Sequence, residues 1–318
     1  MQANSKIYVA GHRGLVGSAI VRKLQEKGYN NILGRTSQEL DLRDQASVKQ
    51  FFEEEQPEHV YLAAAKVGGI LANSNYPAQF IYDNLMMQSN IIEAAKNYGV
   101  KKLLFLGSTC IYPRLAPQPL KEEYLLTDEL EPTNEPYAIA KIAGIKMCNA
   151  YNRQYGTNFM SVMPTNLYGP NDNFDLQNSH VLPALMRKIH EAKTNGSETV
   201  TIWGSGTPLR EFLHVDDLAD ACVYLMENHS AEEIDTFVNI GTGKEISIRE
   251  LAEQLCSIIG FKGRLVYDST KPDGTPRKIT DVTRLEQLGW RYTIELEEGV
   301  RDTYQWYLEH VVNNDERT

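Results

Sequence analysis

Near its amino terminus the chain reads Ile7-Tyr-Val-Ala-Gly11-His-Arg-Gly14-Leu-Val-Gly17. A short β-forming run leads directly into three glycines at three-residue spacing, and a helical pattern follows at 18–26. In such a loop one glycine permits a tight turn, one lets the backbone approach a pyrophosphate at the positive helix end, and one lets helix and strand pack closely. The stretch therefore predicts a dinucleotide-binding unit, although its spacing differs from the more common Gly-x-Gly-x-x-Gly.

The first half of the chain continues this alternation of strands and helices. Patterns typical of strands lie at 6–10, 31–33, 59–63, 102–106 and 158–164, and helical patterns follow the first four at 18–26, 45–55, 77–97 and 137–155. Runs such as Val60–Ala65 and Lys102–Gly107 are largely apolar, as expected where helices cover both faces of a sheet. We therefore expect an α/β fold with a Rossmann-type doubly wound parallel sheet.

The alternation ends after Gly169-Pro170, where residues 171–179 form a polar segment rich in Asn and Asp. A later apolar run, Thr236–Ile240, precedes Gly241-Thr-Gly243 and predicts that part of the second half rejoins the sheet. We expect a Rossmann domain of residues 1–170 plus about 215–243. The remainder, about 171–214 plus 244–318, would form a smaller, discontinuous α/β domain that binds the substrate.

Composition excludes several classes of function. The 318 residues (36.0 kDa) include 42% hydrophobic and 23% charged residues, as in soluble globular proteins. The formal net charge of −10 would repel a nucleic-acid backbone or an anionic lipid surface, so neither is an expected partner. Four widely spaced cysteines without a CxxC pair, and no apolar run long enough for a signal peptide or membrane span, indicate a reduced, cytoplasmic protein. No metal site is predicted.

The segment after the second strand indicates which dinucleotide is bound. An NAD-binding fold places an acidic residue there to accept hydrogen bonds from the ribose 2′-hydroxyl. Here Asn31-Ile-Leu33 runs into Gly34-Arg-Thr-Ser37 without an acid, and Arg13 lies within the glycine loop. Because Arg13 and Arg35 could hold a 2′-phosphate, we expect NADPH/NADP in preference to NAD.

Three residues predict a carbonyl-reducing site. Tyr137 and Lys141 are four residues apart in a helical pattern and so share a face, where the ammonium could lower the phenol's pKa. Ser108 follows the strand at 102–106, at the sheet edge where doubly wound folds bind ligands. The pairs Tyr98/Lys102 and Tyr267/Lys271 have the same spacing, but Gly99 interrupts the first and Pro272 follows the second, so neither shares a helical face. His214 is expected to be structural.

Together these residues resemble the extended short-chain dehydrogenase/reductases, and the similarity extends over essentially the whole chain. Within that family the chain is similar to the members that convert GDP-4-keto-6-deoxy-D-mannose to GDP-L-fucose. The segments that carry the resemblance are Ala10–Gly14, Leu62–Gly69, Gly107-Ser-Thr-Cys-Ile-Tyr-Pro113, Glu131-Pro-Thr-Asn-Glu-Pro-Tyr-Ala-Ile-Ala-Lys141, Ser161–Pro170, Asn178–His180, Trp203–Pro208, Arg210–Asp217 and Lys271–Lys278. Two positions depart from frequent family residues, since Ser37 and Lys188 stand where relatives can carry arginine.

The resemblance implies a role for each site residue. Tyr137, with Lys141 and Ser108, would protonate the C4 oxygen during NADPH-dependent 4-reduction, and Cys110 and His180 would be the acid/base pair for 3,5-epimerisation. The GDP-sugar would be held by Lys188, Trp203, Arg210, Asp273 and Lys278. The implied cofactor-binding residues are Gly11, His12, Arg13, Gly14, Leu15, Val16, Gly17, Arg35, Ser37, Asp41, Leu42, Leu106, Gly107, Ser108, Lys141, Pro164, Asn166, Leu167 and His180. Members of this family are homodimers.

The implied chemistry is consistent with general acid–base principles. Protons beside a ketone are acidic because the enolate charge moves onto oxygen, which Tyr137 and Ser108 would stabilise. Cys and His, with ordinary pKa values of about 8.5 and 6.5, can exchange protons near neutral pH. Two other functions fit the fold: another nucleotide-sugar epimerase, dehydratase or 4-ketoreductase of this family, and a redox-sensing NADP-binding regulator. The regulator would not need Ser108, Tyr137 and Lys141 together.

Overall fold

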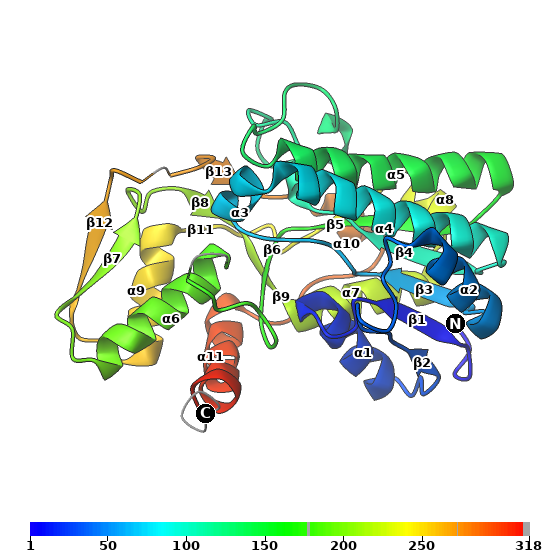
Figure 1. The fold of residues 1–318 in the computed structure, drawn as a ribbon. Helices are drawn as coiled ribbons and strands as arrows, with labels where there is room; N and C mark the ends of the chain where they lie inside the picture. The colour runs from blue at the N-terminus through cyan, green and yellow to red at the C-terminus, as the bar shows by residue number, and fades with distance from the viewer. Residues whose placement is uncertain (177–178, 272, 314–318) are drawn as a thin grey trace.

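The computed structural model describes residues 1–176, 179–271 and 273–313 (Figure 1). Within this part of the chain the largest sheet has six strands, all parallel, in the order β10-β5-β4-β3-β1-β2. This confirms the expected doubly wound parallel sheet. The strands are β1 (Ile7–Ala10), β2 (Ile32–Leu33), β3 (His59–Leu62), β4 (Lys102–Leu106), β5 (Phe159–Pro164) and β10 (Val238–Ile240).

Helices cover both faces of this sheet because successive strand side chains point in opposite directions. Ile7 and Val9 belong to a core shared with α1 and α7, whereas Tyr8 and Ala10 belong to a second core shared with α2, α4 and α5. Figure 1 shows α4 and α5 side by side over one face, with α1 and α7 on the other. These helices are α1 (Leu15–Glu26), α7 (Val215–Asn228), α2 (Gln45–Glu55), α4 (Pro77–Asn97) and α5 (Glu135–Tyr155).

Local sequence determines where several helices begin and end. The carboxylate of Asp44 accepts a hydrogen bond from the Ala46 amide (3.1 Å) and caps the amino end of α2. Gly28 and Gly99 follow α1 and α4 with φ angles of +84° and +71°, a conformation that glycine adopts without strain. Both glycines therefore mark the ends of helices.

A second layer of structure is built around its own apolar core. Figure 1 shows α6, α9 and α11 grouped to one side of the large sheet, with β7 and β12 beyond them. β7 pairs with β12 in parallel, and β8 lies between β11 and β13. The elements are α6 (Val181–Thr194), α9 (Ile248–Ile259), α11 (Leu296–Tyr307), β7 (Thr199–Trp203), β8 (Leu209–Arg210), β11 (Ile246–Ser247), β12 (Arg264–Asp268) and β13 (Arg277–Lys278).

The chain crosses between the two layers several times. β6 (Asn166–Tyr168) extends directly from β5 and pairs with β9 (Phe212–His214), which leads into α7. β10 then pairs with β5, so the late apolar strand rejoins the sheet as predicted. The remaining elements are α3 (Ile70–Asn75), α8 (Ala231–Ile234), α10 (Thr283–Gln287), the 3₁₀ helices η1 (Thr109–Ile111) and η2 (Glu122–Tyr124), and a π-helical turn η3 (Leu308–Val312). None of the described helices combines the length and apolar character that crossing a membrane requires.

Candidate active site

Three predicted catalytic side chains come together at the carboxyl end of β4. Ser108 follows β4 as the N-cap of η1, and its side chain is near enough to the Tyr137 phenol to lower that group's pKa. Tyr137 and Lys141 lie one turn apart near the start of α5, and Lys141 Nζ donates a 2.8 Å hydrogen bond to the carbonyl oxygen of Leu106. The same Nζ lies 5.8 Å from the centroid of the Tyr137 ring. The structure thus brings all three residues to one strand end.

Burial dominates the acidity of this group. It lowers the pKa of Lys141 to about 8, with the neighbouring Cys110 acting in the opposite direction. Burial and then Cys110 raise the pKa of Tyr137, while only the Ser108 side chain lowers it. The sequence argument expected the Lys141 ammonium to lower the phenol's pKa, but burial of the phenol raises it instead. Tyr137 is therefore protonated at neutral pH and able to donate a proton.

The two residues of the predicted epimerisation pair share one charged neighbour, Lys278. Cys110 is buried within η1, where burial raises the pKa of its thiol and the Lys278 ammonium is the largest opposing influence. His180 occupies the N-cap position of α6 and is exposed to solvent. Surrounding protein atoms, and after them Lys278, lower its pKa. The Lys278 ammonium thus lowers the pKa of both Cys110 and His180.

The glycine loop has the shape that a pyrophosphate requires. Gly11 has φ +83°, and a Cβ there would lie 2.8 Å from the Ala64 amide nitrogen. A Cβ at Gly17 would lie 2.1 Å from the Gly11 carbonyl oxygen, so helix α1 packs closely on the loop. Gly14 is exposed at the N-cap of α1, and a Cβ added there would lie 3.5 Å from the Gly11 carbonyl oxygen, an ordinary contact distance. The open Gly14 backbone at a helix N-terminus fits a dinucleotide phosphate.

The two arginines expected beside the 2′-phosphate are placed differently. Arg13 is exposed and has no hydrogen bond or ion pair with the described residues. Arg35 instead donates a 2.6 Å hydrogen bond to the Glu55 carboxylate and lies 5.4 Å from the Phe51 ring centroid. Ser37 is exposed in the loop that follows. Of the two cations, Arg13 is the one whose charge is available to a ligand.

The other predicted cofactor residues lie in or after several strands of the structure and at the start of α1. His12 packs on Gly34, where a Cβ would lie 2.4 Å from the imidazole Cγ. Asp41 is bound by Arg43, which lowers the pKa of its carboxyl to about 2, and the neighbouring Leu42 carbonyl accepts a hydrogen bond from Asn90. The remaining residues, on α1 and at the ends of β4, β5 and β6, are Leu15, Val16, Leu106, Gly107, Pro164, Asn166 and Leu167. All of these follow the carboxyl edge of the parallel sheet.

The predicted GDP-sugar residues lie in the second layer of structure. Arg210 and Lys278 are directly paired on the neighbouring parallel strands β8 and β13. Trp203, 48% exposed at the end of β7, has the Lys188 ammonium 4.7 Å from its ring centroid. Asp273 binds the turn after β7, since its carboxylate accepts hydrogen bonds from the amide and hydroxyl of Ser205 (2.7 and 2.8 Å). An aromatic face with nearby cations suits a purine base joined to phosphates.

The sequence analysis missed Glu211, which organises these strands. Glu211 is fully buried, and one carboxylate oxygen accepts hydrogen bonds from the amides of Thr242 and Gly243 (2.6 and 2.8 Å). The other oxygen accepts from the amide and hydroxyl of Thr280 (2.8 and 2.7 Å). Its own carbonyl accepts from Asn166 Nδ2 (2.8 Å). Glu211 therefore ties the substrate strands to the cofactor edge of the sheet, and its partners are too distant in sequence for a pattern to show this.

A second missed residue holds the loop after β3. Asn84 is buried in α4, where its carboxamide pairs with both backbone groups of Lys66 (2.9 and 3.0 Å). Lys66 Nζ in turn lies 3.0 Å from the Asp83 carboxylate. A polar residue at a buried helix position was the only sequence indication of this contact.

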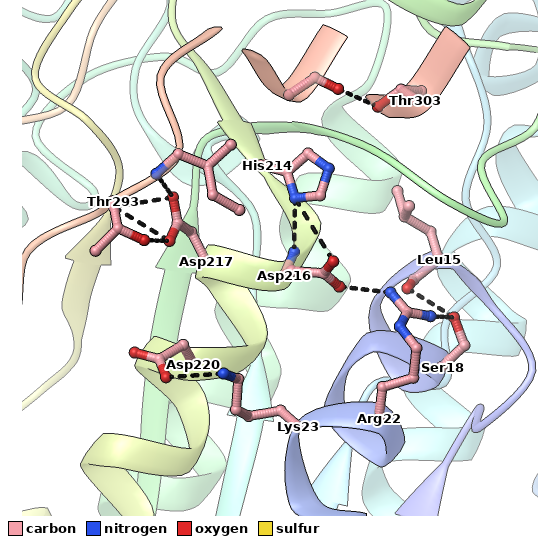
Figure 2. A network of polar contacts seen from close by, with 12 residues as sticks. Leu15, Ser18, Arg22, Lys23, His214, Asp216, Asp217, Asp220, Thr293 and Thr303 are labelled. Atoms are coloured by element: carbon pink, nitrogen blue, oxygen red, sulfur yellow. Dashed lines mark hydrogen bonds and ion pairs between the residues drawn. The ribbon is translucent and has the colours of Figure 1, made fainter. Parts of the chain in front are cut away.

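The alternative Tyr/Lys pairs and His214 lie in structural positions. Lys102 donates to the carbonyls of Met226 and His229 at the end of α7, and Tyr267 stacks with Arg249. Figure 2 shows His214 accepting a hydrogen bond from the Asp216 amide (3.2 Å), which caps the start of α7. The same figure shows further polar contacts joining α1 to α7, including the Lys23–Asp220 ion pair. No cluster of potential metal ligands occurs among the residues of known placement.

Comparison with known proteins assigns this arrangement to a family. Residues 7–241 match the NAD dependent epimerase/dehydratase family. The chain is 62% identical to GDP-L-fucose synthase 1 of Arabidopsis thaliana over 310 residues, which are 98% of this chain and 95% of that protein. It is 57% identical to GDP-L-fucose synthase of Escherichia coli (strain K12), with 97% of this chain and 98% of that protein covered.

A solved structure shares the fold over nearly its full length. MlghC, a GDP-mannoheptose C4 reductase from Campylobacter jejuni with NADP bound, superposes with a TM-score of 0.91 at 45% identity and covers 96% of this chain and 99% of its own. The whole-chain identity to the plant and bacterial enzymes is higher still. The chain therefore belongs to the NAD dependent epimerase/dehydratase family and, within it, to the GDP-L-fucose synthase family.

Proposed function

We propose that this protein converts GDP-4-keto-6-deoxy-D-mannose to GDP-L-fucose by 3,5-epimerisation and NADPH-dependent 4-reduction. The observation that carries the proposal is the convergence of two catalytic sets. Ser108, Tyr137 and Lys141 meet at the end of β4, and Cys110 lies within the next turn of chain. One set suits carbonyl reduction and the other suits proton exchange beside the carbonyl. The high identity to GDP-L-fucose synthases supports the same conclusion.

The residues of the glycine loop fit NADPH. The amino end of α1, where the exposed Gly14 leaves room for a ligand, would hold the pyrophosphate, and the exposed Arg13 would hold the 2′-phosphate. Asn166 and Leu167 of β6 would border the nicotinamide end. When bound, NADPH supplies the hydride for C4.

Epimerisation requires a base on one face of the sugar and an acid on the other. We assign the base to the Cys110 thiolate, which the Lys278 ammonium stabilises, and the acid to His180. Removal of a proton from C3 or C5 moves charge onto the C4 oxygen, where Ser108 and Tyr137 would stabilise it by hydrogen bonds. Reprotonation from the opposite face inverts the carbon.

Reduction uses the same oxygen. As hydride arrives at C4, Tyr137 would donate its phenolic proton to the developing alkoxide. Lys141 positions this proton transfer from the neighbouring turn of α5 and is itself fixed by the Leu106 carbonyl. The raised pKa of Tyr137 keeps the phenol protonated until it is needed.

Substrate recognition is assigned to the second layer of structure. Trp203 would contact the guanine base, and Lys188, Arg210 and Lys278 would offer positive charge to the diphosphate and sugar. Asp273 would contribute through the turn that it fixes. We further propose the division into a Rossmann domain and a discontinuous GDP-sugar domain, supported by the separate apolar core around α6, α9 and α11.

We also propose that the protein is a cytoplasmic homodimer. α4 and α5 lie side by side, and their outer surfaces or ends expose the large apolar side chains of Tyr76, Tyr82, Ile139 and Tyr155. A second copy packed there would cover these side chains in a four-helix arrangement. The four cysteines are unpaired, which suits a reducing compartment. Light scattering on the purified protein tests the dimer.

The function is tested with purified protein, GDP-4-keto-6-deoxy-D-mannose and NADPH. We expect stoichiometric loss of NADPH absorbance and a product with inverted C3 and C5, identified by NMR. An enzyme that regenerates its bound cofactor, such as a 4-epimerase or dehydratase, would give product without net NADPH consumption. That outcome would assign the chain to the other branch of its family.

A further inference from the structure

Two successive epimerisations place a demand on the proposed acid/base pair. In each one, the Cys110 thiolate accepts a proton from carbon and the His180 imidazolium gives a proton to the opposite face. The pair then stands as thiol and neutral imidazole, whereas the second epimerisation again needs thiolate and imidazolium. One proton must therefore leave Cys110, and another must reach His180, while the sugar is still bound. This argument rests on the proposed function.

The two residues differ in their access to water. His180 is exposed and can take its proton from solvent. Cys110 is only 7% exposed, and a substrate over the thiol would close the side that Ser108 and Tyr137 share. A proton on Cys110 therefore needs a separate route to solvent.

A small polar cavity borders Cys110. Its volume is about 30 Å³, room for about two water molecules and far too small for a hexose. It adjoins the proposed sugar site at Cys110 and Lys278 and extends from there to Asn134 and Glu131, whereas Ser108, Tyr137 and His180 do not border it. The residues that line it are Cys110, Tyr112, Pro113, Arg114, Gln118, Leu120, Glu131, Asn134, Thr275, Arg277 and Lys278.

Asn134 is the feature of this cavity that points to water. It occupies the N-cap position of α5, where Asn side chains usually accept a hydrogen bond from the helix, yet it makes no capping bond. Its Oδ1 is buried and has no hydrogen-bond partner in the structure. A buried amide oxygen without a partner is costly, and a bound water removes that cost. Asn134 therefore supplies an acceptor for water beside the Cys110 thiol.

The cavity also reaches solvent through a charged pair. Glu131 lines it and lies 3.3 Å from Arg114, whose side chain is 57% exposed. Glu131 also interacts electrostatically with Lys278, which faces the same cavity. Thiol, amide, carboxylate and ammonium thus border one space at the edge of the protein.

We propose that this cavity is a water site that carries the proton from Cys110 to solvent between the two epimerisations. The thiol S–H bond breaks, and its proton passes to water bound by Asn134. That water releases a proton toward Glu131 and bulk solvent, leaving the thiolate beside Lys278. No oxidant or further reactant is needed, and His180 regains its proton from solvent on the open side. Asn134 and Glu131 are positioning residues for this return step.

Single turnovers in D₂O test the proposal. Excess enzyme is mixed with keto sugar and NADP⁺, which permits exchange without reduction, and deuterium at C3 and C5 is followed by rapid quench and mass spectrometry. In Asn134→Leu the first deuterium should enter within about threefold of the wild-type rate, while entry of the second slows by about tenfold or more. With NADPH present, the variant should release GDP-6-deoxy sugar inverted at one carbon only.

Three further variants separate the relay from general damage. Asn149→Leu, the same substitution on α5 away from the cavity, should exchange both carbons like wild type. Asn134→Ser keeps an acceptor and leaves room for water, so it should restore most of the second exchange. Glu131→Gln keeps the shape of the cavity but removes the acceptor of the proton, and should again slow the second exchange selectively.

The outcomes are distinguishable. If Asn134→Leu and Glu131→Gln both keep the wild-type ratio of first to second exchange, or lower both rates equally, the relay is wrong. Should Asn134→Leu fail to fold, Glu131→Gln decides in the same way. If wild-type enzyme exchanges neither carbon and consumes no NADPH, the proposed function itself fails.

Discussion

Lys141 Nζ donates a 2.8 Å hydrogen bond to the carbonyl oxygen of Leu106, so the first turns of α5 are fixed to the end of β4. This contact sets the position of Tyr137, one turn away on the same helix, relative to Ser108 after the strand. Burial of this ammonium group lowers the pKa of Lys141 to about 8.

The first prediction concerns pH. Because Lys141 loses its proton as pH rises through about 8, kcat for the reduction should fall above that pH in wild-type enzyme. Lys141→Arg keeps its charge, so its lower kcat should not decline over the same range. NADPH oxidation measured from about pH 6.5 to 9.5 provides the check. An unchanged alkaline limb in Lys141→Arg would assign that ionisation to another group.

The second prediction is the preference for NADPH. A charge-assisted contact from Arg13 to the 2′-phosphate should favour NADPH over NADH by about tenfold to a hundredfold in kcat/KM. Arg13→Ala should remove most of that preference and leave the NADH value nearly unchanged. Arg35→Ala should have a smaller effect because the guanidinium is already paired with Glu55. Equal losses with both cofactors in Arg13→Ala would contradict the assignment.

Arg35 illustrates what the sequence could and could not predict. The alternation of strands and helices is a local pattern, so the sheet, its glycine loop and the position of Arg35 after β2 were predictable. The side chain's partner was not, because Glu55 lies twenty residues further on and reaches Arg35 only after α2 packs beside the strand. Sequence distance therefore hid the ion pair that occupies Arg35 in the folded chain.

The second layer of structure was less predictable for a similar reason. β8 and β13 have two residues each, too short for a hydrophobic pattern, and they pair across nearly seventy positions of chain. Arg210 and Lys278 were named from family resemblance, whereas Glu211, the residue directly after β8, was missed. A single buried carboxylate produces no periodic sequence pattern, and only the amide and hydroxyl donors that surround it in the fold reveal its role.

The third prediction identifies the proton donor. Tyr137→Phe removes the phenol and should lower kcat for reduction by about 10²–10⁴-fold, with little change in melting temperature because the ring still packs against Phe80. Tyr98→Phe and Tyr267→Phe are matched controls and should turn over like wild type. A comparable loss in either control would mean that a different tyrosine donates the proton.

The fourth prediction concerns stability in acid. His59 is buried at the start of β3, where burial, followed by the positive amino terminus, lowers its pKa to about 4. In the unfolded chain the His59 ring binds a proton near pH 6.5, whereas in the folded chain it does so only near pH 4. The free energy of unfolding is therefore unaffected by this group above pH 6.5, and it decreases by up to about 3 kcal/mol as pH falls toward 4. Melting temperatures at two pH values should therefore differ less in His59→Gln than in wild type. Substituting the exposed His310 in the same way should leave the wild-type difference intact.

The last prediction separates the two half-reactions through Cys110. Serine is nearly isosteric, but an alcohol is far too weak a base near neutral pH, even beside the Lys278 ammonium. Cys110→Ser should therefore suppress deuterium uptake at C3 and C5 when the keto sugar is incubated in D₂O with NADP⁺. Hydride transfer depends on Tyr137, Lys141 and the cofactor, so reduction of the unepimerised ketone should persist and yield a GDP-6-deoxy sugar of different stereochemistry.

His180→Asn provides the complementary measurement, because it removes the acid while Cys110 remains. Proton abstraction could still occur there, but delivery to the opposite face would be lost, so deuterium should return from the Cys110 side with retention instead of inversion. NMR of the recovered sugar distinguishes the two stereochemical outcomes. Wild-type exchange in Cys110→Ser would remove the thiol from the mechanism and leave it as a buried packing residue of η1, and the water site behind it would then have no proton to carry.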